Sequence, residues 1–558
     1  MGDKLPIRPK YLQWAIDLWV IDDSIPGITP RKVLFYAVLI FTVALVAGVI
    51  RFAQRRTIHG IARRIEYHLR RDFFAHLQTL SANYYNNVRT GDLMTRATSD
   101  MNAVRMVLSS AVMYTADAIV FFFLALIIML QIDVSLTLLV LIPYPVLAVL
   151  IRELAKRVHK CYEDIQEAYS TLNTKVQENL SGVRVVKAYT LEEGEVERFR
   201  EHNQDFVERN RERIRLTTFF FPLFRVLPGL GGVILLWVGG LHVINGKITL
   251  GDFVSFSAYL GMLIRPMITL GFIVNTFERG AASMERINKI LDEKPEIYDD
   301  EDVREDIKAI RGEIELRNLT FAYPDSPPVL KNIDLKIPSG ATVAIVGPTG
   351  CGKTTLVNLL ARIYQAERGT LFIDGVDIHD IPLKTLRSNI GFIQQEPFLF
   401  SDLLKNNIAY GSENASEVQI KEAAHAADLL TQIEEFPDGL ETFLGERGVT
   451  ISGGQKQRTA LARAILVNPN ILVLDDAFAS VDTHTEDTIL THLKSIMADR
   501  TTILISHRIS TVKSADLIVV LKDGEIVERG THEELLEHRG IYANIHEKQL
   551  LQEELDEF

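Results

Sequence analysis

Five long apolar runs in the first half of the chain constrain its fold more than any other feature. Each is long enough to cross the hydrocarbon layer of a membrane as a helix. The runs cover residues 33–50, 107–132, 134–151, 216–244 and 253–277. Single charges interrupt three of them, at Asp117, Arg225 and Arg265. Five such runs are not expected in the core of a soluble domain, so the first half is predicted to be an α-helical transmembrane bundle.

Clusters of Lys and Arg set the orientation of these spans. Basic segments at 51–71, 152–160 and 209–215 flank the spans, whereas the short loops 131–135 and 245–252 carry only Lys247 as a cation. Basic flanks stay in the cytoplasm, so the short loops are expected outside and the second half of the chain inside. Five spans that end inside place residue 1 outside. We therefore interpret 11–20 as the end of a truncated or missing first span, with a re-entrant or interfacial helix as the alternative.

The stretches between spans, 52–105 and 152–215, combine helical periodicity with dense charge. They are too long for loops and too polar for lipid, so helices that extend below the membrane are expected. The bulk numbers exclude other classes: two cysteines among 558 residues cannot form a disulfide framework, which favours a reducing compartment. A net charge of −12 argues against nucleic acid as a partner.

An acidic linker precedes a second half with the composition of an α/β domain. There a β-type run leads through Gly347–Thr354 into a helical pattern, and this turn fits G-x-x-x-x-G-K-[ST]. Glycines let backbone N–H groups close on phosphate oxygens at the positive end of a helix. Lys353 is expected to neutralise the β- and γ-phosphates of ATP, and Thr354 to ligate Mg²⁺.

Two adjacent carboxylates follow the aliphatic run 471–474. Asp475 and Asp476 would repel each other unless a cation lies beside them. The Mg²⁺ expected at the phosphate loop is that cation, and Asp475 has the features of the carboxylate that holds it. Asp476 stands where a general base would orient water for attack on the γ-phosphorus.

The S-G-G-Q sequence at Ser452–Gln455 completes a resemblance to the ATP-binding cassette (ABC) proteins, and the whole chain resembles an ABC exporter half-transporter. The resemblance implies a transmembrane domain at 1–290, a linker at 291–311 and a nucleotide-binding domain at 312–558. It also implies that the tips of two intracellular loops couple the domains, and that Gly445–Gly448 is the loop typical of exporters. ATP would lie between the phosphate loop of one domain and the S-G-G-Q of a second, so a partner half-transporter is required.

The resemblance assigns roles residue by residue. The catalytic group would be Asp476, His507 and Gln395, and Asp482 would close the D-loop. The Mg²⁺ ligands would be Thr354, Gln395 and Asp475. The signature that acts on the partner's nucleotide would be Ser452, Gly453, Gly454 and Gln455. The nucleotide-binding residues would be Tyr323, which stacks on adenine, Gly347, Pro348, Thr349, Gly350, Cys351, Gly352, Lys353, Thr354 and Thr355.

One position departs from the family pattern, which usually has Glu where this chain has Asp476. The shorter carboxylate sits roughly 1 Å from the working position, a displacement that can cost on the order of 10²-fold in rate. This predicts a slow ATP site in one half of a heterodimer that exports a drug or a lipid from the cell membrane. A homodimeric exporter or lipid flippase and a regulatory subunit that binds ATP without hydrolysis remain alternatives. The membrane spans argue against a non-transporting ABC protein.

Three further expectations concern single side chains. Cys351 lies beside Lys353 and a helix N-terminus, which favours a reactive thiolate whose alkylation blocks ATP binding; the alternative is that Cys351 simply fills a position for a small residue such as Ser or Ala. Asp117, Arg225 and Arg265 are candidates for a functional site because charges are expensive in hydrocarbon. Phenylalanines at 121–123, 219–221 and 224 either line a cavity for apolar cargo or face lipid and neighbouring helices.

Overall fold

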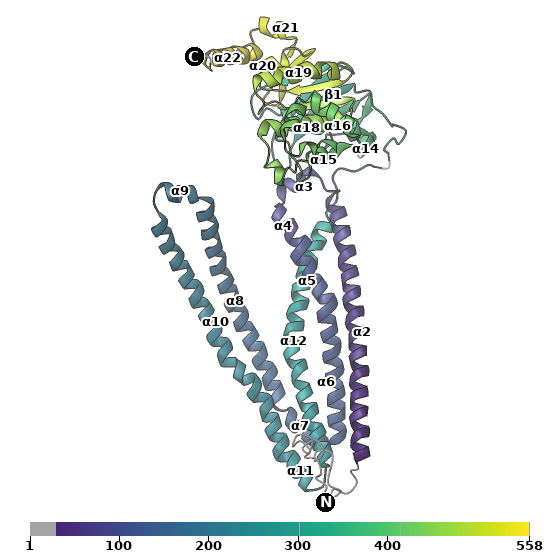
Figure 1. The fold of residues 1–558 in the computed structure, drawn as a ribbon, viewed down its shortest axis with the longest axis vertical. Coiled ribbons are helices and arrows are strands. Elements are labelled where there is room, and N and C mark those ends of the chain that lie inside the picture. Colours follow the sequence, from purple (N-terminus) through teal and green to yellow (C-terminus); the bar gives the residue numbers. More distant parts are fainter. Residues whose placement is uncertain (1–29, 301, 413, 557–558) are drawn as a thin grey trace, which may run out of the picture. The chain divides into compact units, whose positions relative to one another are not determined.

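The computed structural model describes residues 30–300, 302–412 and 414–556 (Figure 1). These residues form two compact units. The first takes the described residues up to Ala75 together with Gly91–Asp292, and the second takes His76–Thr90 with the described residues from Glu293 onward. The expected segment 11–20 lies outside the described residues.

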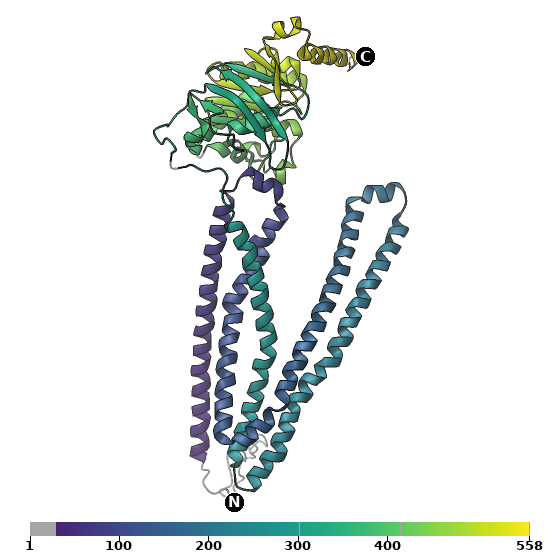
Figure 2. The same cartoon turned by 180° about the vertical axis from the view of Figure 1, so that it is seen from behind.

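Helices make up the described part of the first half of the chain (Figures 1 and 2). In chain order they are α2 (Pro30–Leu77), α3 (Ala82–Asn87), α4 (Thr90–Thr95), η1 (Arg96–Asp100), α5 (Met101–Met106), η2 (Val107–Ala111), α6 (Val112–Ile132), α7 (Val134–Leu141), α8 (Pro143–Ser181), α9 (Val183–Ala188), α10 (Glu192–Ile234), η3 (Leu235–Gly239), α11 (Gly240–Ile244) and α12 (Leu250–Leu291).

Four helical segments of the described chain are long and apolar enough to cross a membrane. They are Val33–Leu77, Thr90–Ile132, Val134–Ser181 and Leu250–Leu291, and they contain four of the five expected runs. The remaining run, 216–244, is helical as well, but its first part continues the charged helix α10, and only Gly229–Ile244 stands out as a shorter apolar helix. The helical bundle is confirmed.

The polar stretches between spans are long helices, as expected. Helices α8 and α10 lie side by side in both views and are joined at tip α9 (Figures 1 and 2). The Arg209 guanidinium of α10 donates to the Asp164 carbonyl oxygen of α8 at 3.0 Å and lies 3.2 Å from the Glu167 carboxylate. Some of the charged side chains on these helices therefore form contacts between α8 and α10.

Helix α12 packs closely against the π-helical turns that interrupt the 90–132 segment. A Cβ added at Gly280 would lie 2.1 Å from Cγ2 of Val107, so only glycine permits this approach. One turn further along α12, the buried Asp100 carboxylate accepts from Ser283 at 2.9 Å and pairs with Arg286 at 2.6 Å. These contacts fix the cytoplasmic part of α12 against its neighbour.

The second unit contains two sheets. A four-stranded antiparallel sheet has the order β2-β1-β4-β5, and a six-stranded sheet has the order β10-β9-β3-β8-β7-β6 with parallel pairing except at β10. The strands are β1 (Ile314–Ala322), β2 (Pro328–Ile337), β3 (Thr342–Val346), β4 (Leu371–Ile373), β5 (Val376–Asp377), β6 (Ile390–Ile393), β7 (Ile471–Asp475), β8 (Thr501–Ile505), β9 (Leu517–Lys522) and β10 (Glu525–Gly530).

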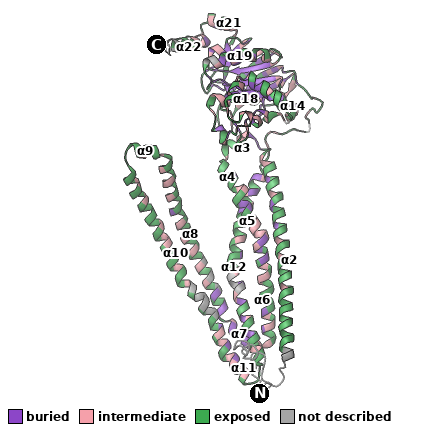
Figure 3. Cartoon of the chain, viewed as in Figure 1, coloured by how far each residue is buried: buried purple, intermediate pink, exposed green. Residues whose placement is uncertain are grey.

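Helices flank the six-stranded sheet, whose central strands β3, β8 and β7 are buried on both faces (Figure 3). Alternate residues of β7 belong to two different hydrophobic clusters, with Leu472 and Leu474 in one and Ile471 and Val473 in the other. This explains its continuous aliphatic sequence. The helices are α13 (Lys353–Leu360), α14 (Leu383–Ser388), α15 (Leu404–Ile408), α16 (Glu417–Ala426), α17 (Leu430–Glu435), α18 (Gly453–Leu466), α19 (Thr483–Met497), α20 (Ile509–Val512), α21 (His532–Glu537) and α22 (Ile541–Asp556).

Helix α3 belongs to this second unit. The Asn86 amide donates to the Tyr364 hydroxyl at 2.8 Å, and Ser81 donates to the Glu296 carboxylate at 2.9 Å. The tip of the first intracellular loop therefore contacts the α/β domain, in line with the coupling that the resemblance implies.

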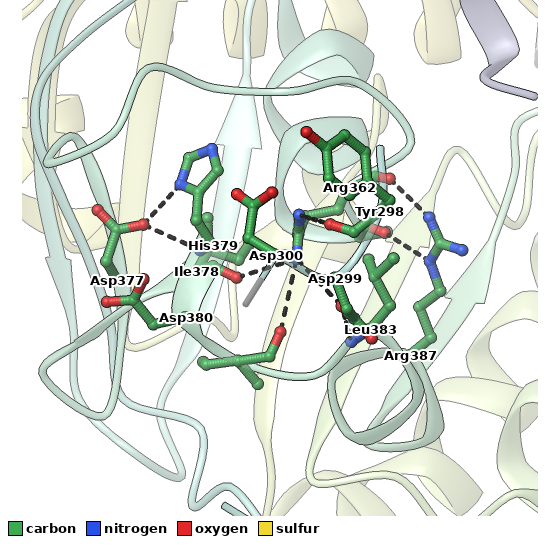
Figure 4. Close-up of polar contacts among 12 residues, drawn as sticks. Tyr298, Asp299, Asp300, Arg362, Asp377, Ile378, His379, Asp380, Leu383 and Arg387 are labelled. Atoms are coloured by element: carbon green, nitrogen blue, oxygen red, sulfur yellow. Dashed lines mark hydrogen bonds and ion pairs between the residues drawn. The ribbon is translucent and has the colours of Figure 1, made fainter. Parts of the chain in front are cut away.

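The linker is fastened to the α/β domain just beyond the end of α13 (Figure 4). Arg362 is 2% exposed, and its guanidinium donates to the carbonyl oxygen of Tyr298 in the linker at 3.2 Å. The Asp299 carboxylate accepts from the backbone N–H of Leu383 at 2.9 Å. The helix that begins at the phosphate loop thus ends where the linker is held.

Candidate active site

The carboxyl ends of four adjacent parallel strands carry most of the expected catalytic residues. Gly347 follows β3, His507 lies two residues after β8, Asp475 ends β7, and Gln395 lies two residues after β6. Strand order β3-β8-β7-β6 places these residues along one edge of the sheet. This is the edge where ligands bind in open α/β sheets.

The phosphate loop is a turn that glycine alone can form. Gly347, Gly350 and Gly352 have φ of 156°, 82° and 101°. A Cβ at Gly347 would lie 2.1 Å from the carbonyl oxygen of Leu521 in β9. The loop is therefore pressed against the sheet, with its backbone free to turn N–H groups inward at the start of α13.

Lys353 is held inside this loop. Its side chain is buried, and its ammonium donates to the carbonyl oxygens of Gly347 at 2.8 Å and Pro348 at 3.0 Å. These contacts place a fixed positive charge within the curve of the loop. A phosphate bound there would meet a cation that is already oriented.

Asp475 is the strongest sign of a cation site. The residue is 1% exposed, and neither carboxylate oxygen has a hydrogen-bond partner in the part of the chain that the structure describes. Burial raises the pKa of Asp475, and the Asp476 charge adds to this rise, whereas Thr354, Lys353 and His507 oppose it. A buried anion without a partner is unfavourable, so these oxygens fit a role in holding Mg²⁺.

The described residues contain no group of three or more His, Cys, Asp or Glu side chains arranged for a metal ion. Mg²⁺ beside a nucleotide would take one or two protein ligands and complete its shell with phosphates and water. Thr354 is exposed at the first turn of α13 and Gln395 is exposed after β6.

Asp476 and His507 face each other. The His507 Nε2 lies 3.3 Å from Oδ2 of Asp476, and Asp476 itself has a φ of 48°. A left-handed conformation is uncommon for a residue with a Cβ and marks a position fixed by its surroundings. Here the backbone N–H of Asp476 donates to Ile505 of β8 at 2.9 Å, which locks the two strand ends together.

Sequence reasoning missed the residues that hold His507 in place. The Gln549 side chain of α22 makes two hydrogen bonds to the backbone around His507. Its carbonyl accepts from the Ile509 N–H at 2.9 Å, and its amide donates to the His507 carbonyl oxygen. On the other side the fully buried Glu486 pairs with Arg508 and accepts from Thr511. No short motif marks Gln549, which lies 42 residues beyond His507.

The signature residues form the start of α18. Ser452 and Gln455 make a capping box, in which the Ser452 hydroxyl accepts from the Gln455 N–H at 3.3 Å and the Gln455 side chain accepts from the Ser452 N–H at 2.9 Å. Ser452 and Gly453 are exposed. The helix thus presents its N-terminal turn outward, as a contact with a second domain requires.

Gln457, a second residue that the sequence did not single out, joins this helix to the catalytic edge. Its amide donates to the Asp476 carbonyl oxygen at 3.4 Å and its carbonyl accepts from the Ser480 N–H at 2.8 Å. A Cβ at Gly454 would lie 2.9 Å from the Ser480 carbonyl oxygen. The second glycine of S-G-G-Q is therefore required for packing within the domain.

The remaining expected residues lie around this edge. Half-buried Tyr323 hydrogen-bonds through its hydroxyl to Thr355 at 3.0 Å and packs edge-on against Tyr364. Asp482 caps α19 by accepting from the Thr485 N–H at 2.9 Å, which lowers the pKa of Asp482. Stacking of Tyr323 on adenine remains a prediction.

The expectation of a reactive thiolate at Cys351 is wrong. The side chain is buried, and burial raises the pKa of Cys351. The Lys353 ammonium, whose Nζ lies 4.0 Å from the sulfur, lowers that pKa but does not prevail. Desolvation therefore outweighs the two effects on which the expectation was based.

The side-chain contacts of the described intramembrane candidates include the edge-on ring pairs Phe122–Phe123 and Phe219–Phe220. Asp117 accepts a hydrogen bond from the Gln54 amide at 3.3 Å. Among the phenylalanines, Phe123 and Phe219 are largely exposed on their helices and Phe121 lines a cavity. The side chains of Phe221, Phe224, Arg225 and Arg265 lie outside the described residues.

Comparison with known proteins identifies both halves of the chain. The family model described as the ABC transporter transmembrane region matches residues 16–267, and the family model described as ABC transporter matches residues 330–479. The chain is 37% identical to the probable multidrug resistance ABC transporter ATP-binding/permease protein YheI of Bacillus subtilis, over 97% of this chain and 92% of that protein. It is 38% identical to the ATP-dependent lipid A-core flippase of Syntrophus aciditrophicus, over 93% and 86%.

A solved structure is similar over nearly the whole chain. It is a bacterial Atm1-family ABC exporter with ATP bound, at 27% identity and a TM-score of 0.79, covering 96% of this chain and 94% of that one.

Proposed function

Because the chain belongs to the ABC transporter family, as a multi-pass membrane protein whose cytoplasmic domain is an ABC ATPase, we propose that it exports an amphiphilic or hydrophobic compound, a drug or a lipid. It works as one half of a heterodimer, and its own ATP site is the slower of the two. The names of its relatives support this cargo class, since they include a multidrug transporter and a lipid flippase.

The carboxylate of Asp475, which is buried beside the phosphate loop with no hydrogen-bond partner assigned among the described residues, is the observation that carries the ATPase assignment. In this proposal the loop N–H groups and Lys353 bind the β- and γ-phosphates of ATP. Thr354, Gln395 and Asp475 would hold Mg²⁺, which when bound neutralises charge on the phosphate oxygens.

Asp476 would accept a proton from the attacking water, and His507 would hold the γ-phosphate. The contact at 3.3 Å between Asp476 and His507 supports a shared role. Aspartate is one methylene shorter than the usual glutamate, so its carboxylate stands back from the water, which supports slow hydrolysis at this site. Tyr323 would stack on the adenine.

The exposed N-terminal turn of α18 supports the second half of the proposal. Ser452–Gln455 would close over the partner's nucleotide, so that ATP joins two domains and hydrolysis releases them. Closure transmitted through α3 and the long helices would then switch the membrane cavity between inward- and outward-facing states.

The native complex, purified in mild detergent from its own host, tests the assembly. We expect a second half-transporter of different mass at a one-to-one ratio, with Glu at the position of Asp476. Two identical chains would overturn the heterodimer and favour the alternative, a homodimeric exporter or flippase whose sites both use Asp476.

Replacing Lys353 tests the ATPase assignment. Lys353→Ala should abolish ATP binding at this chain's site, because the loop loses its fixed cation. Photolabelling with azido-ATP, read separately on the two chains, measures this. Unchanged labelling of the variant chain would refute the assignment.

A further inference from the structure

A cavity of about 410 Å³ lies between α2, α6 and α12 within the helical unit. Its wall combines apolar side chains, among them Met113, Phe121 and Met262, with the polar groups Arg51, Gln54, Arg55 and Asp117. A mostly apolar pocket with a few polar groups is the usual form of a small-molecule site.

The depth of the cavity follows from helix geometry. Arg51 lies 21 residues after Pro30 in α2, which is roughly 31 Å along the helix axis. That is about the thickness of the hydrocarbon layer. Arg51 directly follows the apolar run 33–50, so the polar end of the cavity lies at the level of the cytoplasmic headgroups.

Two positive charges are available at that level. Arg51 and Arg55 are four residues apart and therefore lie on one face of α2. Both are exposed, and neither has an ion pair with a described residue. Asp117 forms no ion pair with either Arg within the described part of the chain, and its carboxylate accepts from Gln54 at 3.3 Å. The described residues of the lining thus carry a net charge of +1, from two Arg and one Asp.

We propose that this cavity binds a phosphate-bearing amphiphile from the cytoplasmic leaflet. Arg51 and Arg55 hold the anionic head, and Phe121, Met113 and Met262 contact the start of its tail. Asp117 repels the head and limits the affinity, which favours release. This assignment rests on the proposed function and names the substrate class of the exporter.

Binding to the purified native complex without nucleotide tests the proposal. Dioctanoyl phosphatidic acid is compared with dioctanoylglycerol, which has the same chains and no phosphate. We expect at least tenfold tighter binding of the phosphatidic acid. Arg51→Gln or Arg55→Gln should each weaken it by about tenfold, the value of one charge-assisted hydrogen bond, without affecting dioctanoylglycerol.

Two further variants test whether the cavity selects for negative charge on the lipid head. Asp117→Asn should strengthen binding of the phosphatidic acid, since the amide keeps the contact with Gln54 and removes the repulsion. Arg56→Gln should change nothing, because Arg56 is exposed on the same helix outside the cavity. Equal affinity for the two lipids would overturn the proposal. So would weaker binding on Asp117→Asn, which indicates a cation site.

Inorganic phosphate separates a lipid headgroup from a free anion. Millimolar phosphate should not displace the lipid, and displacement would show that the tail is not recognised. Bound phosphatidic acid that is never moved by ATP would contradict the export function and leave the site intact. Transport of another amphiphile with no preference for phosphate would contradict the site alone.

Discussion

Asp475→Asn should make the nucleotide-free α/β domain more stable while it removes the response to Mg²⁺. In the wild type a carboxylate that is 1% exposed has no hydrogen-bond partner among the described residues and lies beside a second carboxylate. A buried unsatisfied polar group costs about 1–3 kcal/mol, and a charge costs more. The amide keeps the volume and removes the charge, so we expect a gain of about 1–3 kcal/mol in the free energy of unfolding.

The stability gained by Asp475→Asn should depend on pH. Burial raises the pKa of Asp475 in the folded state, so the ionised form is the one that destabilises the fold. The advantage of Asp475→Asn should be full above the folded-state pKa. It should shrink as pH falls through that pKa, because the wild-type carboxyl then takes up a proton.

Differential scanning fluorimetry of the native complex measures both effects. A gain of this size corresponds to a rise of several degrees in the melting temperature of the α/β domain. Mg-ATP should stabilise the wild type by RT ln(1 + [L]/Kd), and the variant much less. Asp374→Asn is the matched control, because its carboxylate accepts backbone N–H bonds from Arg311, Gly312 and Glu313, so the same change should destabilise. A lower apo melting temperature for Asp475→Asn, with an unchanged Mg-ATP response, would refute the reasoning.

Two other substitutions test contacts that were seen only in the structure. Gln549→Glu can still accept from the Ile509 N–H but cannot donate to the His507 carbonyl oxygen, so kcat for ATP hydrolysis should fall by about tenfold with little change in KM. Lys548→Ala on the same helix is the control and should leave both constants unchanged. Equal losses in the two variants would refute a positioning role for Gln549. Arg286→Ala leaves the buried Asp100 without its cationic partner, with the Ser283 hydroxyl still bound, and should destabilise the helical unit by about 1–2 kcal/mol at neutral pH, as Arg286 is itself 42% exposed. Protonation of Asp100 at low pH removes the charge that Arg286 balances, so this loss should shrink in urea unfolding as pH falls, and a loss that is constant with pH would contradict the prediction.

The sequence predicted those features that depend on runs of similar residues or on fixed spacing. Apolar runs indicated the spans, charge indicated the helices beyond the membrane, and the loop Gly347–Thr354 marked the strand–loop–helix unit. The position of Asp475 at the end of a buried strand could be predicted because an aliphatic run precedes it.

Contacts between residues far apart in the chain could not be predicted in this way. Gln549 and Gln457 act through single amides that no spacing rule marks, and Gly454 is explained by the Ser480 backbone as much as by the partner. Cys351 failed for a physical reason, since sequence proximity to a cation shows attraction but not the opposing cost of burial. The run 216–244 continues the charged helix α10, so only its second part, Gly229–Ile244, stands out in the structure as an apolar helix.

The central claim is that this chain supplies a slow ATP site of its own and the signature for its partner's competent site. ATP hydrolysis by the native complex, measured with Asp476→Asn and Ser452→Ala placed separately in this chain, tests it most directly. We predict that Ser452→Ala removes nearly all turnover and that Asp476→Asn leaves most of it. Turnover abolished by Asp476→Asn, or untouched by Ser452→Ala, would contradict the account.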